Sequence, residues 1–341
     1  MGKPVIGALT SATEHIRIDH YSAVHLAAQI ARSLAQQCAL PGALPDQAAV
    51  VASELGSNIA KHATDGALFI QHLPLGSGVE ILAADRGPGM PELQRCLADG
   101  YSTTATLGAG LGAVSRIATD FLIRTQGATG TLACARVTAP EQPPSYAHDV
   151  GALCLPADGE PTSGDACAII DTDLARTAIV VDGLGHGPAA AEAAQSALRA
   201  FHRAPDRPLP EILNAIHRAL RRTRGGAVGL LRLYPGRAEY CGIGNVRALA
   251  LTPHGVHHRL TGQPGIAGLH IPAPQVRGIP WEQGSTAVLH TDGIDHRWAL
   301  APPPHLLRLP PPLLAAALAH SHRLTRDDAT VLVAASQQRL P

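Results

Sequence analysis

Four short acidic motifs, each beside an apolar run of strand-like length, constrain this chain more than any other feature. The run AIVVDGLGHGP at 178–188 ends an apolar segment on Asp182 and then turns on three glycines. GD at 164–165 precedes a second apolar run, HTDG at 290–293 follows a third, and DD at 327–328 precedes ATVLVA. One aspartate before glycine is ordinary turn chemistry. Four such positions that converge could hold two divalent cations, and glycine lets a backbone carbonyl approach the metal as well.

The composition is that of a globular chain with two domains. Its 341 residues are 45% hydrophobic and 16% charged, enough to bury two cores. The 27 basic residues balance 27 acidic ones, so no nucleic-acid partner is expected. The six cysteines form no CxxC pair, which favours reduced thiols over a disulfide framework or a zinc site. No apolar run reaches membrane-spanning length and the N-terminus does not resemble a signal peptide, so we expect a cytoplasmic protein without a membrane partner.

The periodicity of apolar residues predicts an α/β protein in both halves. Helical spacing predicts the helices and short apolar runs bounded by turn residues predict the strands. The Pro-rich stretch TAPEQPPSYAH at 138–148 reads as an extended linker between the two domains. Helices are expected at 21–38, 46–62, 113–121, 188–202, 209–222 and 313–324, and strands at 79–84, 130–137, 152–155, 166–170, 177–181 and within 228–260.

Three polar side chains share one face of the second predicted helix. Glu54, Asn58 and Lys61 are spaced i, i+4, i+7, while Val51, Leu55 and Ile59 make an apolar stripe. Taken alone, the polar face is most simply explained as a solvated surface with a Glu-to-Lys pair. The segments directly after this helix favour a binding site instead.

Two of these segments are rich in glycine. Asp85 ends a predicted strand and is succeeded by RGPG at 86–89, and LGAGLG at 107–112 opens the helix expected at 113–121. A glycine-rich loop that leads into a helix N-terminus presents backbone N–H groups to phosphate. The letters also satisfy GxGxxA, but we reject a dinucleotide-binding fold because no strand leads into the loop, and no GK[ST] P-loop exists.

In their order, ELGSNIAKHA, AADRGPGMP and LADGYSTTATLGAGLGAVSRIATDF resemble the Bergerat-fold (GHKL) ATPases and kinases, and within them the RsbT switch kinases. The resemblance implies a Bergerat-fold α/β sandwich that binds ATP with Mg²⁺. In it, Asn58 would hold the Mg²⁺, Glu54 would orient or deprotonate the attacking hydroxyl, and Asp85 would accept from the adenine amino group. The implied ATP-binding residues are Asn58, Lys61, Asp85, Gly87, Gly89, Gly108, Gly110, Gly112 and Thr131.

From Val150 onward, SGD, VVDGLGHG, HTDGID and RDDATVLV look like the metal-dependent PPM-type serine/threonine phosphatases of the SpoIIE and RsbX kind. The resemblance implies an α-β-β-α sandwich with two Mn²⁺ or Mg²⁺ ions, which Asp182 would bridge. Asp327 is preferred over Asp328, for which a capping role stays open. Leu184 stands where eukaryotic relatives place histidine, so His186 receives no general-acid role. The implied metal ligands are Asp165, Asp182, the carbonyl of Gly183, Asp292 and Asp327.

The two resemblances together predict a fused regulator with a kinase domain at 1–138, a linker at 139–149 and a phosphatase domain at 150–341. Its expected substrates are STAS-domain proteins of the RsbS or RsbR kind in a bacterial stress-response or sigma-factor pathway, phosphorylated and dephosphorylated on serine or threonine. Two alternatives stay open: a phosphatase whose first half only senses ATP or docks a partner, and a non-catalytic switch that binds a partner. A Glu54→Ala variant that regulates normally would favour the first. Homodimer formation is also left open.

Overall fold

The computed structural model describes residues 5–9, 12–90, 93, 110–127, 130–140 and 148–336. The chain forms two compact units. The smaller unit is Thr13–Ala147, and the larger unit combines Met1–Ala12 with His148–Pro341. Strand β1 (Val5–Leu9) pairs antiparallel with β8 (Asp165–Asp171). The first residues therefore differ from the expected division, because their backbone completes a sheet edge of the second unit. The linker expected at 139–149 lies largely outside the described residues, and its limits stay a prediction.

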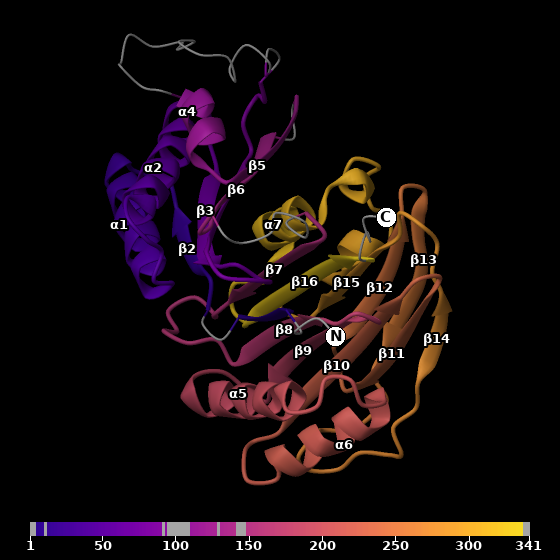
Figure 1. The fold of residues 1–341 in the computed structure, drawn as a ribbon. Coiled ribbons are helices and arrows are strands. Elements are labelled where there is room, and N and C mark those ends of the chain that lie inside the picture. Colours follow the sequence, from indigo (N-terminus) through magenta and orange to yellow (C-terminus); the bar gives the residue numbers. More distant parts are fainter. Residues whose placement is uncertain are drawn as a thin grey trace. The chain divides into compact units, whose positions relative to one another are not determined.

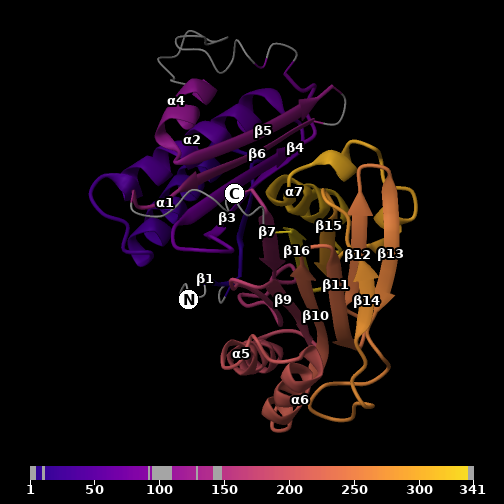
Figure 2. The same cartoon turned by 45° about the vertical axis from the view of Figure 1, so that its right-hand side comes forward.

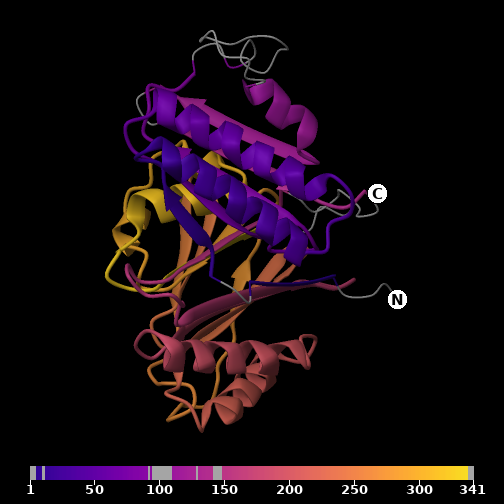
Figure 3. The ribbon, with the colours of Figure 1, turned by 90° about the vertical axis from the view of Figure 1, so that its left-hand side faces the viewer.

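The Thr13–Ala147 unit is a two-layer α/β sandwich, as expected. Its five strands form an antiparallel sheet in the order β2-β3-β4-β6-β5. Figure 3 shows α1 and α2 side by side on one face of this sheet. Alternate strand residues and the inward stripes of the helices form a single core between the layers. The elements are α1 (Tyr21–Gln37), α2 (Leu44–His62), α4 (Gly110–Ile117), β2 (Glu14–Arg17), β3 (Gly66–His72), β4 (Val79–Asp85), β5 (Asp120–Gln126) and β6 (Gly130–Val137).

Local sequence sets the helix limits in this unit. His20 caps α1 by accepting from the Ser22 backbone N–H, and Pro45 lies in the first turn of α2, where its missing N–H costs nothing. The helix expected at 113–121 ends at Ile117 instead. The Thr119 N–H then donates to the Arg136 carbonyl (2.8 Å), which leads the chain into β5, a strand that the sequence analysis missed.

The larger unit is an α-β-β-α sandwich, as expected (Figures 1 and 2). Helices α5 (Pro188–His202) and α6 (Leu209–Leu220) cover the sheet β1-β8-β9-β10-β11-β14, and α7 (Pro311–His322) packs on the sheet β13-β12-β15-β16-β7. The remaining strands are β7 (Val150–Leu155), β9 (Arg176–Gly183), β10 (Gly226–Tyr234), β11 (Arg237–Ile243), β12 (Arg247–Thr252), β13 (Gly255–Thr261), β14 (Arg277–Pro280), β15 (Thr286–His290) and β16 (Ala329–Ala335).

A buried ion pair connects the two sheets of the larger unit. Arg176 is 1% exposed, and its Nε and Nη2 donate to the two carboxylate oxygens of Asp171 at 2.7 and 2.8 Å. Its Nη1 donates to the Ala335 carbonyl at the end of β16 (2.7 Å). The guanidinium therefore joins the β8–β9 turn to the neighbouring sheet.

Within the described residues, no helix is both long and apolar enough to cross a membrane.

Candidate functional site

Strand pairing brings the acidic motifs to one end of the sandwich, where their strands begin or end. The four aspartates at this end, Asp165, Asp182, Asp292 and Asp327, are called the acidic edge below. Asp165 opens β8 and stands opposite Asp182 near the end of β9. In the facing sheet, Asp292 follows β15 and Asp327 precedes β16, and these two strands pair antiparallel. The end of one antiparallel strand lies beside the start of its neighbour, so each sheet brings its own two aspartates together. Hydrogen bonds of Asn245 and Thr291 join the two pairs across the sheets.

Burial and the neighbouring carboxylates change the pKa values of Asp165, Asp182 and Asp327. Burial, together with the Asp292 carboxylate, raises the pKa of Asp182 to about 7. Burial and the charge of Asp182 raise the pKa of Asp165, and burial and Asp292 raise that of Asp327. In each case burial and a neighbouring negative charge disfavour the ionised form.

Asn245 joins two of the aspartates. Its Nδ2 donates to Asp182 Oδ2 at 3.1 Å and to Asp292 Oδ2 at 2.7 Å. One amide group thus lies between two carboxylates from different sheets. The sequence analysis did not single out Asn245. The signal was its place in GIGNVRAL, directly after a hairpin strand.

Asp165 and Asp328 differ in their surroundings. Asp165 is buried and accepts from the Thr291 hydroxyl at 2.8 Å. Asp328 accepts from the backbone N–H groups of Ala157 (2.9 Å) and Gly164 (2.8 Å), so it holds the loop that leads into β8. This is the capping role that the sequence left open for Asp328, while the neighbouring Asp327 is exposed.

Both Asp-Gly pairs of the site need their glycine. A Cβ on Gly183 would lie 2.5 Å from the Ala190 carbonyl oxygen, and one on Gly293 would lie 2.0 Å from that of Asp328. A side chain at either position would push the adjoining aspartate out of place. Close backbone approach is therefore the physical reason for the repeated Asp-Gly pattern.

The donor set fits hard divalent cations. It consists of crowded carboxylate oxygens, which suit Mg²⁺ or Mn²⁺ better than zinc. Among the described residues, no three His, Cys, Asp or Glu side chains already stand at metal-binding spacing. The Asn245 amide provides the positive end of a dipole between Asp182 and Asp292 and lowers the pKa of Asp182 in part.

Two further side chains border the acidic site. A Cβ on Gly185 would lie 3.2 Å from Arg224 Nη1, so this exposed guanidinium lies against the loop that follows Asp182. His186 Nδ1 lies 2.9 Å from Glu160 Oε1, and its side chain is 66% exposed. His186 is thus a loop histidine, as the sequence analysis concluded. The sequence analysis did not single out Arg224, which lies in TRGG at the start of β10.

In the smaller unit, Asp85 is oriented by backbone groups. Its Oδ1 accepts from the N–H groups of Gly87 (2.8 Å) and Thr131 (3.1 Å). Burial raises its pKa, and the two hydrogen bonds lower it in part. Its Oδ2 has no hydrogen bond among the residues described and can accept one from a ligand. The structure thus brings together Asp85, Gly87 and Thr131, three of the residues expected at the adenine.

Asn58 on α2 has a buried amide nitrogen without a hydrogen-bond partner among the described residues. Buried amide groups usually have a hydrogen-bond partner, so this donor is available to a group outside the described residues. The end of α2 approaches the loop after β4, since a Cβ on Gly87 would lie 3.2 Å from the His62 carbonyl oxygen.

Only some of the other residues expected to bind the nucleotide are among the described residues. Glu54 is half-buried on α2 and Lys61 is exposed near its end. Gly89 follows β4 with φ of 73°. Gly110 and Gly112 lie in the first turn of α4, whereas Gly108 and the stretch 100–103 lie outside the described residues. The cradle expected around the phosphates therefore stays a prediction.

Comparisons with known proteins find two kinds of relative. Residues 175–337 match the family model described as Stage II sporulation protein E (SpoIIE). The serine/threonine-protein kinase RsbT of Bacillus subtilis (strain 168) is 35% identical over 109 residues, which are 31% of this chain and 80% of that protein.

Two solved structures share the fold. One, described as the bacterial stressosome, a modular system adapted to control secondary messenger signalling, is 30% identical with a TM-score of 0.51. That similarity covers 55% of this chain and 98% of the other. The RsbU and RsbW domains of a Mycobacterium tuberculosis protein are 21% identical with a TM-score of 0.50, covering 57% of this chain and 61% of that one, and show the fold alone.

Proposed function

Because this chain belongs to the RsbT kinase family over part of its length and has a SpoIIE-type phosphatase domain at 175–337, we propose that it is a bifunctional regulator. Its larger unit removes phosphate from serine or threonine of a partner protein, and its smaller unit adds phosphate from ATP. The proposed partners are STAS-domain proteins of the RsbS or RsbR kind. The observation that supports the phosphatase most strongly is the pair Asp182 and Asp292 joined by Asn245.

In the larger unit the chain's own residues position a phosphorylated side chain. The residues proposed to hold two Mn²⁺ or Mg²⁺ ions are Asp165, Asp182, the Gly183 carbonyl, Asp292 and Asp327. Such ions, when bound, activate water and neutralise phosphoryl oxygens. Asn245 fixes the spacing of the two central carboxylates, and Thr291 orients Asp165.

Arg224 would supply a positive group for the substrate in this site. Its guanidinium lies against Gly185, beside a cluster otherwise made of acids. Arginine matches the geometry of a phosphate and can donate two parallel hydrogen bonds to it. We assign it to the substrate phosphate.

In the smaller unit Asp85 would accept from the adenine amino group through Oδ2, since Oδ1 is already engaged by Gly87 and Thr131. Asn58 would hold the Mg²⁺ through its side-chain oxygen, since an amide nitrogen can only donate. Glu54, one turn earlier on α2, would orient or deprotonate the attacking hydroxyl. Phosphoryl transfer depends mainly on such positioning and on charge neutralisation.

The phosphatase proposal is tested by hydrolysis of p-nitrophenyl phosphate and of a phosphorylated STAS-domain protein by the full chain. Activity should require Mn²⁺ or Mg²⁺, disappear with EDTA, and fall by about two orders of magnitude or more in Asp182→Asn, because metal-bound water needs its ligands. Asp173→Asn, in the β8–β9 turn away from the acidic edge, is the control. Full activity in EDTA, or in Asp182→Asn, would refute the proposal.

A further inference from the structure

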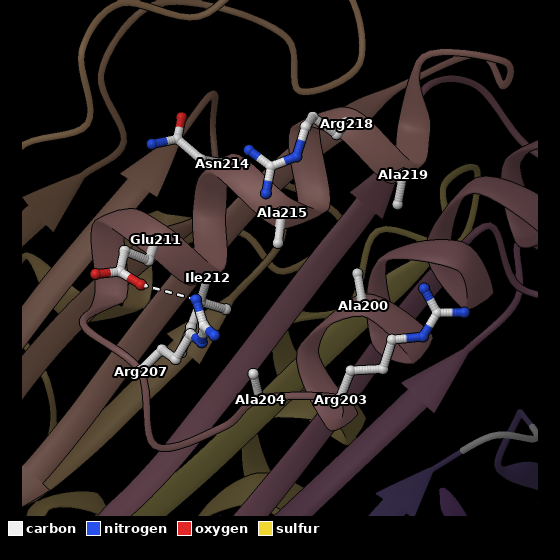
Figure 4. Close-up of a pocket in the computed structure, with 10 residues that line it drawn as sticks. All are labelled: Ala200, Arg203, Ala204, Arg207, Glu211, Ile212, Asn214, Ala215, Arg218 and Ala219. Carbon is white, nitrogen blue, oxygen red and sulfur yellow. Dashed lines mark hydrogen bonds and ion pairs between the residues drawn. The ribbon is translucent and has the colours of Figure 1, made fainter.

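A groove lies on the outer side of the larger unit between α5 and α6, away from the acidic edge. Figure 4 shows it bordered by the end of α5, the connecting turn and one face of α6. Its volume is about 520 Å³. Small side chains line its floor: Ala200, Ala204, Ala215 and Ala219. This volume is within the range of sites that hold an organic ligand or a short peptide, and far larger than one phosphate ion needs.

Three arginines stand around this alanine floor, namely Arg203, Arg207 and Arg218 (Figure 4). The one acidic lining residue, Glu211, pairs with Arg207 at 3.3 Å. Arg203 and Arg218 have no ion-pair partner in the described part of the chain. Two exposed guanidinium groups on opposite helices are therefore available to an incoming acidic ligand.

The positive charge is concentrated in this part of the sequence. Residues 199–224 contain seven arginines and two acidic residues, although the whole chain balances 27 basic against 27 acidic residues. Burial lowers the pKa of His217, and the nearby Arg221 and Arg218 lower it further. A surface with this excess attracts and orients an acidic partner.

The groove is held in shape from beneath. Arg232 on β10 is 6% exposed, and its Nη2 donates to the backbone carbonyls of Arg207 (2.9 Å) and Pro205 in the α5–α6 turn. Its Nε donates to the Thr177 hydroxyl at 2.9 Å. A buried charge thus fixes the turn that presents the arginines, which lowers the entropy lost on binding.

We propose that this groove docks an acidic segment of the protein substrate. The inference rests on the proposed phosphatase function and adds the class of partner sequence that the enzyme selects. An alanine floor offers contact to a peptide backbone and its methylene groups, while Arg203 and Arg218 pair with Asp or Glu side chains from both sides. Arg203 lies about 24 Å along the helix axis from Gly187 beside the acidic edge, at 1.5 Å per residue. The groove is thus a docking site separate from the phosphate-binding site.

Docking at a distance from the reacting phosphate should affect substrate capture and leave chemistry unchanged. The test compares the full-length chain with Arg203→Glu/Arg218→Glu and with Arg199→Glu. The Arg199→Glu control reverses the same charge on α5 at an exposed residue that does not line the groove. Arg203→Gln/Arg218→Gln, expected to be intermediate, separates loss of attraction from repulsion.

Three measurements decide the proposal: hydrolysis of p-nitrophenyl phosphate, hydrolysis of the phosphorylated STAS-domain protein, and fluorescence anisotropy with a fluorescein-labelled hexa-aspartate peptide. In the Glu double variant, KM for the phosphoprotein and Kd for the peptide should both rise about tenfold, with p-nitrophenyl phosphate turnover unchanged. Raising the salt concentration should reduce the difference in KM and in Kd between the double variant and the wild type.

An unchanged KM and Kd in the double variant would overturn the proposal, as would an equal effect of Arg199→Glu. Equal competition with the peptide by inorganic phosphate, by duplex DNA or by anionic lipid vesicles would also overturn it, in favour of a general anion surface. If neither phosphorylated substrate is hydrolysed by the wild type, the phosphatase proposal fails. The peptide measurement still tests the groove in that case.

Discussion

At the scale of single residues, Asn245 links the two sheets at the acidic edge of the larger unit. Its amide donates to Asp182 and Asp292, which come from different sheets and would otherwise repel each other. When no divalent cation is bound, the Asn245 amide offsets this repulsion. Its contribution should therefore depend on whether cations are present.

We predict that Asn245→Ala lowers the free energy of unfolding by about 1 kcal/mol in EDTA, because two crowded carboxylates lose their shared donor. With Mn²⁺ present the loss should shrink, since cations would then neutralise the same carboxylates. Thermal unfolding with EDTA and with Mn²⁺ measures both values, with Asn214→Ala as the control away from the site. An equal loss in both conditions would contradict the assignment.

Arg224 allows a kinetic prediction. Arg224→Ala should raise KM for p-nitrophenyl phosphate about five- to tenfold with a smaller change in kcat, because one charge-assisted contact to the substrate phosphate is lost. Arg222→Ala removes the same charge two residues earlier and should leave KM within twofold of the wild type. Steady-state kinetics in saturating Mn²⁺ measures KM and kcat for both variants. Equal effects of the two substitutions would mean that only general surface charge matters.

Asp85 makes the corresponding prediction for ATP. An asparagine can keep its oxygen on the Gly87 and Thr131 N–H groups, but then presents an NH₂ donor to the adenine amino group. Asp85→Asn should therefore weaken ATP binding by about 10- to 100-fold without a change in fold. Isothermal titration calorimetry with ATP, beside a thermal unfolding control, measures this. Wild-type affinity in Asp85→Asn would show that adenine is not bound there.

At the scale of secondary-structure elements, the sandwich depends on the buried pair of Arg176 and Asp171. Removing only the arginine leaves a buried carboxylate without its partner and frees the Ala335 carbonyl. We predict that Arg176→Leu lowers the free energy of unfolding by about 3–5 kcal/mol. The double variant Arg176→Leu/Asp171→Leu should recover part of the loss. Urea unfolding of both variants tests this, and a loss below about 1 kcal/mol in the single variant would contradict it.

Apolar periodicity was sufficient to predict most elements. Helices α1, α2, α5, α6 and α7 and the strands next to the acidic motifs agree with the sequence, because each has a clear apolar face or an apolar run with turn residues at its ends. The pattern failed at β5, since the expected helix was extended to Phe121, whereas Asp120 and Phe121 pair with Arg136 and Ala135 of β6. The place of β1 depends on a backbone partner more than 150 residues away, which periodicity does not report.

Part of the site was predictable for the same physical reason. The aspartates stand at strand ends, and their repeated position beside strand-like runs was the reason to expect that they converge. Asn245, Thr291 and Arg224 were missed because their importance lies in contacts across the fold: an amide shared by two sheets, a hydroxyl on a buried carboxylate, and a guanidinium over a glycine. The motifs around these residues do not show which distant groups they contact.

At the scale of the whole molecule, the chain joins two units whose proposed reactions oppose each other on one kind of substrate. Net labelling of a partner would then depend on which site is faster under given ATP and metal concentrations. A docking groove in the phosphatase unit would favour removal of phosphate from partners with an acidic segment.

The most direct test of two opposed activities is a time course with γ-labelled ATP, Mg²⁺, Mn²⁺ and a STAS-domain partner. It compares the wild type with Asp182→Asn, Glu54→Ala and the double variant. We predict that label accumulates on the partner with Asp182→Asn, stays low with the wild type, and is absent whenever Glu54 is replaced. If no variant labels the partner while separately phosphorylated partner is still cleared by all except the Asp182→Asn variants, the smaller unit is a nucleotide sensor and the claim of two opposed activities is wrong.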